Sequence, residues 1–139
     1  MELEDLLDTF SLISDWEDRY RVLIDLGRKL PGVSEAEKVD SNRVEGCTSQ
    51  VWLIPEVSSD DPPRLSFRAD SDSFIVKGLL AVILLAYSGK TAKEIVATDI
   101  GEIFTRLGLE QNLSPNRRSG FYATVERIKD LARAANRAG

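Results

Sequence analysis

Apolar residues recur every three or four positions along the first third of the chain, which is the period of an amphipathic helix. A short helix is expected over residues 3–10. A second is expected to begin at Ser14, because Ser14 followed by Glu17 has the spacing of a capping box. Leu30-Pro31-Gly32 should end it, since proline cannot continue a helix. The residues predicted to face the core share one side of this helix: Trp16, Tyr20, Leu23, Ile24 and Gly27.

The period changes to two near the middle of the chain, where β-branched and aromatic residues gather. Residues 51–57 and 64–69 are each predicted to form a strand, and the polar spacer over 58–63 is predicted to form the turn between them. Pro55 lacks a backbone N–H, so the first strand should lie at a sheet edge or bulge there. Leu65, Phe67 and Ala69 alternate with polar residues, which is typical of an antiparallel sheet with one solvated face.

The second half of the chain returns to helical spacing. Asp72 is expected to cap a helix over residues 73–87, which is apolar nearly all round and should be covered on every side. Thr91 and Glu94 repeat the capping-box pattern, and a further helix is expected over 100–107. Ser114 before Pro115 opens a last helix to about residue 136. We therefore predict one α+β domain over residues 1–139, with a small antiparallel sheet flanked by helices.

The composition fits a globular domain and narrows its chemistry. Of 139 residues, 42% are hydrophobic and 29% are charged, as in ordinary soluble domains. There is no histidine and one cysteine, Cys47, which excludes serine and cysteine triads, CxxC redox pairs and zinc sites rich in cysteine or histidine. A carboxylate site for magnesium or calcium would remain, but no EF-hand or P-loop spacing occurs. We predict no resident metal.

Charge and hydropathy also bear on location and partners. A net charge of −5 argues against nucleic acid or an anionic membrane as the partner. The N-terminus is acidic, unlike a leader peptide, and the most apolar run, over 78–87, is shorter than the ~20 residues of a membrane helix. With a lone thiol, these features favour a cytoplasmic protein.

Cys47 lies just before the first predicted strand. Judged alone, a free cysteine is more often an inert core residue than a reactive one. Its neighbours are small or polar, including Ser49 and Gln50, which favours a loop that solvent can reach, and Gly46 is the expected hinge. Asp70 and Asp72 form a carboxylate pair, but capping by Asp72 is preferred to acid-base catalysis.

Residues 44–53, VEGCTSQVWL, closely resemble the cysteine motif of SufE proteins. Three more segments resemble the family in the same order, namely residues 15–27, 69–79 and 113–117. The resemblance covers nearly the whole chain, and four separated motifs are far more specific than one.

The resemblance implies a sulfur acceptor and carrier rather than an enzyme acting alone. A cysteine desulfurase of the SufS or CsdA type would pass persulfide sulfur to Cys47 and be stimulated, and iron-sulfur scaffold proteins would receive the sulfur. Pyridoxal phosphate would stay with the desulfurase, so this chain would hold no cofactor. The implied fold resembles the scaffold IscU.

The resemblance also suggests which residues meet the partner: Ser49, Gln50, Asp72 and Arg117. Arg117 lies with Arg118 in the first turn of the last helix, where cations are disfavoured, so either an acidic neighbour or a partner should compensate. Which of the two arginines corresponds to the family's arginine stays open. The oligomeric state is open as well, a homodimer included.

Three alternatives remain at this stage. The chain could be a CsdE-like carrier for another sulfur pathway such as tRNA modification, a redox protein that uses Cys47, or a binding module in which the thiol only packs. In the carrier interpretation the resting loop should hide Cys47, because an exposed persulfide would be lost to cellular thiols. Leu53, Phe67 and the helix over 73–87 are expected to provide the apolar recess.

Overall fold

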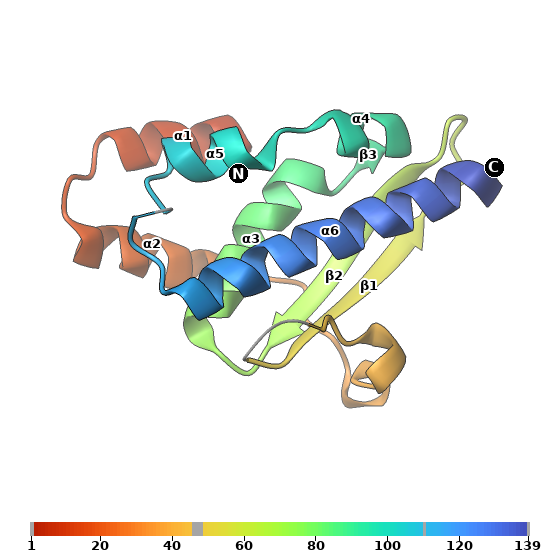
Figure 1. Cartoon of the computed structure of the whole chain (residues 1–139), viewed down its shortest axis with the longest axis horizontal. Helices are drawn as coiled ribbons and strands as arrows, with labels where there is room; N and C mark the ends of the chain where they lie inside the picture. The colour runs from red at the N-terminus through yellow and green to blue at the C-terminus, as the bar shows by residue number, and fades with distance from the viewer. Residues whose placement is uncertain (1, 46–48, 110, 139) are drawn as a thin grey trace.

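A three-stranded antiparallel sheet and six α-helices make up the part of the chain that the computed structural model describes, which is residues 2–45, 49–109 and 111–138. The strands are β1 (Val51–Val57), β2 (Arg64–Ser71) and β3 (Lys90–Thr91), in the order β1-β2-β3. The helices are α1 (Leu3–Ser11), α2 (Trp16–Arg28), α3 (Phe74–Tyr87), α4 (Ala92–Ala97), α5 (Ile100–Arg106) and α6 (Pro115–Ala138). The predicted α+β class is confirmed (Figure 1).

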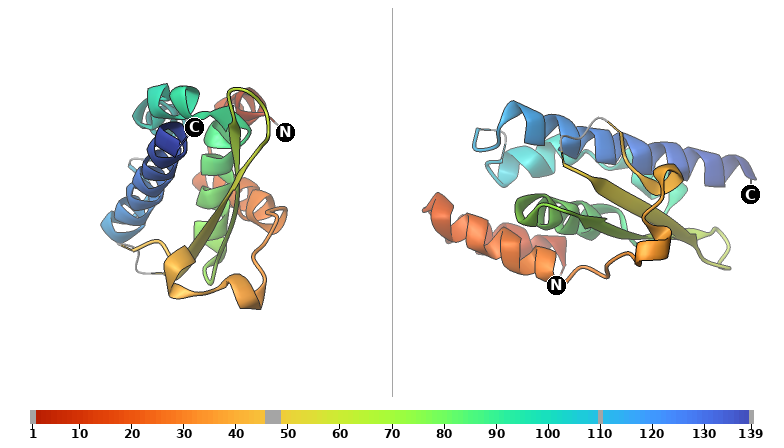
Figure 2. Two further views of the ribbon diagram at one scale, coloured as in Figure 1. Left: turned by 90° about the vertical axis from the view of Figure 1, so that its right-hand side faces the viewer. Right: turned by 90° about the horizontal axis from the view of Figure 1, so that it is seen from below.

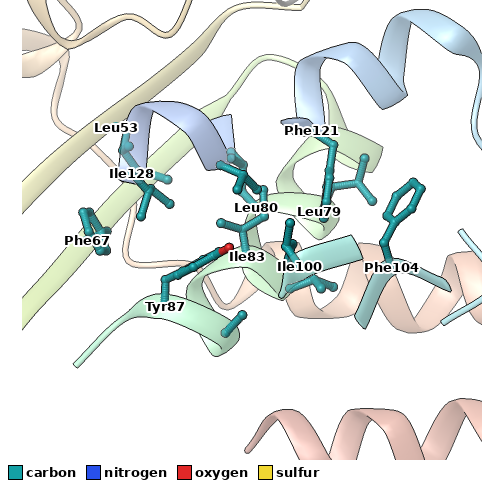
Figure 3. Packing of buried hydrophobic residues seen from close by; sticks show 14 of the residues in the cluster. Leu53, Phe67, Leu79, Leu80, Ile83, Tyr87, Ile100, Phe104, Phe121 and Ile128 are labelled. Carbon is teal, nitrogen blue, oxygen red and sulfur yellow. The ribbon is translucent and has the colours of Figure 1, made fainter. Parts of the chain in front are cut away.

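The hairpin of β1 and β2 follows the alternation of the sequence. Its register runs from Val51 opposite Ser71 to Val57 opposite Leu65. β1 lies at a sheet edge, which explains why Pro55 is tolerated within it. The inward residues of both strands are buried, and Leu53 and Phe67 pack with Ile83 of α3 and Ile128 of α6 (Figure 3).

Two helix caps differ from the sequence prediction by one residue. Asp15 caps α2, where its carboxylate accepts a hydrogen bond of 2.9 Å from the N–H of Glu17, so the prediction of Ser14 is wrong. Ser73 caps α3 by accepting from the N–H of Val76 at 3.4 Å, so the prediction of Asp72 is also wrong. The capping box of Thr91 and Glu94 and the cap of α6 by Ser114 are confirmed.

α2 and α3 cross at a pair of glycines. A Cβ atom on Gly27 would lie 2.7 Å from the backbone nitrogen of Gly78, and one on Gly78 would lie 2.7 Å from the carbonyl carbon of Leu23. Ordinary contacts of this kind need about 3.5–4.0 Å. Only glycine at both positions lets the two backbones approach this closely, so the crossing fixes α2 against the core helix.

The segment over 33–43, which contains the short 3-10 helices η1 (Glu35–Glu37) and η2 (Asp40–Asn42), packs at one end of the outer face of the sheet (Figure 2). Arg68 of β2 forms ion pairs with Glu37 and with Glu56 of β1. The hydrogen bond from Arg68 is the main reason that the pKa of Glu37 falls to about 2. On β2 this outer face is polar, as predicted, whereas β1 adds Trp52 and Ile54 to it. Charged side chains tie the segment over 33–43 to this face, and that segment leads into the cysteine loop.

Candidate functional site

The cysteine loop leaves and rejoins the sheet at one end of β1. The N–H of Val44 donates to the carbonyl of Val51 at 2.8 Å, and Arg43 bridges to Trp52. Val44 and Val51 are buried, so the base of the loop belongs to the core. Residues 46–48 lie outside the described residues, and the predicted roles of Gly46 and Cys47 therefore stay predictions.

Asp72 holds the second stem of this loop. Its carboxylate accepts a hydrogen bond of 3.1 Å from the N–H of Gln50, and its own N–H donates to the carbonyl of Gln50 at 3.4 Å. This reciprocal pair, which we call the Asp72–Gln50 clasp, links the loop to the start of α3. Asp72 thus acts on the loop instead of capping the helix.

A small apolar cavity opens beside Ser49, between α3 and α6. Its volume is about 30 Å³, which is room for roughly two water-sized groups. The side chains of Leu79, Leu80, Ile83 and Phe121, which line it, lie together in Figure 3. The other described residues that line it are Ser49, Val76, Asn116, Arg117, Gly120 and Thr124.

The recess predicted for Cys47 stays a prediction, because Cys47 lies outside the described residues, and the cavity beside Ser49 has only one of the walls named for that recess. α3 contributes as expected, but Leu53 and Phe67 are buried deeper in the core and do not line this cavity. α6 supplies the second wall. A signal for this was present in the sequence, because Arg117, Gly120 and Thr124 recur at helical spacing and so share one face.

The two neighbouring arginines of α6 point to different surroundings. Arg117 is exposed and lines the cavity, and its guanidinium has no ion-pair partner within the described ranges. Arg118 is half-buried, its Nε has no hydrogen-bond partner among those same residues, and it lines a separate groove with Tyr122 and Glu126. Of the two arginines, Arg117 is thus the one that borders the cavity beside the loop, and an acidic neighbour within the described part of the chain does not neutralise it.

Asp70, the other carboxylate of the pair, is fixed by two lysines. Its oxygens lie 3.6 Å from the Nζ of Lys38 and 3.5 Å from the Nζ of Lys77, and only 16% of its side chain is exposed. The hydrogen bond to Glu35, together with the charge of Asp70, raises the pKa of Lys38, which also lies over the ring of Trp52. Asp70 therefore fastens the covering segment and α3 to the sheet.

Across residues 2–45, 49–109 and 111–138, no three acidic side chains gather in a way that could hold a metal ion. Over the same ranges, every helix is too short or too polar to cross a membrane.

The chain is similar to known proteins over most of its length. The family described as "SufE: Fe-S metabolism associated domain" matches residues 4–132. An "Uncharacterized SufE-like protein" of Rhizobium etli is 47% identical over 132 residues, which are 94% of this chain and 89% of the relative. Another, of Rhizobium meliloti, is 42% identical over 131 residues, which are 94% of each chain.

A solved structure shares the fold. The solution structure of a hypothetical protein from Thermus thermophilus superposes with a TM-score of 0.76, at 22% identity, over 96% of this chain and 94% of that one. At this identity the likeness concerns the fold alone. It agrees with the architecture of helices and sheet described above.

Proposed function

The chain belongs to the SufE family, and we propose that it accepts sulfur from a cysteine desulfurase on Cys47 and delivers it to iron-sulfur cluster assembly. The observation that carries this proposal is the placement of the only cysteine of the sequence. In the sequence it falls between Val44, which is fixed to β1, and Gln50, which is fixed to Asp72, and Ser49, two residues after it, lines an apolar cavity together with Arg117.

The transfer is a thiol exchange that needs no oxidant. The Cys47 thiolate attacks the outer sulfur of the desulfurase persulfide, a new S–S bond forms at Cys47, and the bond within the donor persulfide breaks. The donor cysteine leaves as a thiolate and takes up a proton. An ordinary cysteine, with a pKa of about 8.5, is partly ionised near neutral pH, so the absence of histidine from the sequence is no obstacle.

The surroundings support carriage in two ways. The Asp72–Gln50 clasp would limit the positions that the loop can take, and the adjacent cavity is large enough for one small apolar group such as a persulfide sulfur. Removing that sulfur from water would protect it from competing thiols. The exposed guanidinium of Arg117 would meet a carboxylate of the desulfurase beside the loop.

The proposed partners follow from membership of the family. The donor is a desulfurase of the SufS or CsdA type, which keeps the pyridoxal phosphate, and the recipients are iron-sulfur scaffold proteins. Both steps belong to a reducing cytoplasm, where a single free thiol persists.

The direct test is the intact mass of the protein after incubation with an active desulfurase and L-cysteine. We expect the mass to increase by one or more sulfur atoms on Cys47 and to return to its original value when a thiol reductant is added. Omitting L-cysteine provides the control. An unchanged mass, while the desulfurase still produces sulfide from L-cysteine, would contradict the proposal.

The Asp72–Gln50 clasp should also affect how fast an alkylating reagent reaches the Cys47 thiol. Asp72→Ala removes the carboxylate that holds the N–H of Gln50. A hydrogen bond of this kind contributes about 0.5–1.5 kcal/mol, so alkylation of Cys47 in the free protein should become about two- to tenfold faster. Asp72→Asn keeps an acceptor oxygen and should stay closer to the wild-type rate. Equal rates in all three proteins would show that the clasp does not restrain the loop.

A further inference from the structure

The first turn of α3 presents an aromatic side chain to solvent. Phe74 is 69% exposed, which makes it the most exposed aromatic residue among the described residues. α3 is a strongly apolar helix, and its residues from Gly78 onward are largely buried. Single exposed apolar residues are common on protein surfaces, so it is the position of Phe74, and not its exposure alone, that bears on a partner.

Phe74 lies beside the cysteine loop. Asp72, which clasps Gln50, precedes it by two residues, and Val76, two residues further along α3, lines the same cavity as Ser49 and Arg117. The starts of α3 and α6 accordingly meet at one end of the molecule (Figure 1). This end therefore carries the loop, an exposed ring and an exposed cation together.

Sulfur transfer places this end inside any productive interface. The two sulfur atoms must approach to bonding distance, so the surfaces around both thiols come into contact. A standard interface buries about 800 Å² on each partner, which is a patch roughly 30 Å across. Cys47 is only two residues from Ser49, so a patch centred on the thiol extends over the first turn of α3.

The ring is also held in place before any partner arrives. The Nζ of Lys77 lies 5.9 Å from the centroid of the Phe74 ring and 3.5 Å from a carboxylate oxygen of Asp70, which is itself anchored on β2. Ser73 caps the helix at the same point. A side chain on a rigid, capped helix loses little conformational freedom on binding, which is what an interface anchor requires.

We propose that Phe74 is an apolar anchor for the desulfurase, inserted into a recess of the desulfurase surface whose rim carries a carboxylate for Arg117. This inference rests on the proposed sulfur-carrier function and adds a specific binding residue to it. The ring would set the affinity of the complex, whereas the chemistry would remain with Cys47. Phe74 acts by contact with the partner and takes no part in the exchange of sulfur.

The test compares Phe74→Ala with wild type in two measurements on the full chain. The dissociation constant for the desulfurase should rise about tenfold, as for loss of a buried aromatic anchor. The concentration giving half-maximal stimulation should rise by a similar factor, while the rate at saturation should stay unchanged. Phe74→Tyr, which keeps the ring, should bind within about threefold of wild type.

Val57→Ala is the matched control, because Val57 is 55% exposed and lies at the far end of β1. If Phe74→Ala binds as tightly as wild type and Val57→Ala, the anchor is disproved, whereas failure of wild type to accept sulfur would instead disprove the carrier function. Sedimentation of the chain without the desulfurase gives its oligomeric state and tests whether Phe74 instead contacts a second copy of the chain. If Phe74→Ala converts a dimer to a monomer, the ring covers a second copy of this chain and the proposal is overturned.

Discussion

Replacing Cys47 with serine is expected to abolish sulfur loading and desulfurase stimulation while leaving the fold intact. A serine hydroxyl is not ionised near neutral pH and cannot accept a persulfide sulfur by exchange, because that chemistry requires a thiolate. The two side chains are nearly the same size and the predicted site is a loop, so the free energy of unfolding should change little. Intact mass, the rate of the desulfurase and urea unfolding measure the three effects.

The matched control for this variant is Leu12→Ser, which introduces the same side chain at a residue that is 87% exposed and lies between α1 and α2. It should load sulfur as wild type does. If Cys47→Ser stimulates the desulfurase fully, the thiol is not the acceptor and the chain acts as a binding module. If the variant binds without stimulating, docking and transfer are separate properties of the same surface.

The elements of the fold were predictable because their signals are local. Both strands of the hairpin, the edge or bulge expected from Pro55 and the six helices of the described residues follow from spacing and capping within a few residues. The two-residue strand β3 and the 3-10 helices η1 and η2 were not predicted, because such short elements have no periodicity to detect. The errors arose where two neighbouring residues could both form a cap. Asp72 and Ser73 are equally good candidates by sequence, and the choice depends on Gln50, which is 22 residues away and occupies the Asp72 carboxylate.

The site was predictable only in part, for the same reason. The resemblance to the family selected Cys47 and Arg117 from their motifs, but the second wall of the cavity comes from α6, which reaches the loop only in the folded chain. Phe74 was assigned to a covered helix face because its neighbours are apolar. No sequence pattern distinguishes the one exposed turn of such a helix from the buried turns that follow it.

The crossing of α2 and α3 should be the point of the fold most sensitive to a small substitution. In Gly78→Ala, the added methyl group would overlap the backbone of Leu23, and neither helix can yield by moving a flexible side chain. Overpacking of this kind costs about 3 kcal/mol, and the better helix propensity of alanine returns only about 1 kcal/mol. The free energy of unfolding should therefore fall by about 2 kcal/mol or more, a large share of the total stability of a domain.

Gly101→Ala is the control for helix propensity, because a Cβ atom there would meet only a carboxylate oxygen of Asp99, at 3.2 Å. Its free energy of unfolding in urea should stay within about 1 kcal/mol of wild type. Gly27→Ala, which would press on the backbone of Gly78 from the other side, should behave like Gly78→Ala. Equal stability of Gly78→Ala and Gly101→Ala would mean that α2 can shift away from α3 at little cost. In that case the close crossing would not be what holds the core helix, and with it the clasp at Asp72, in position.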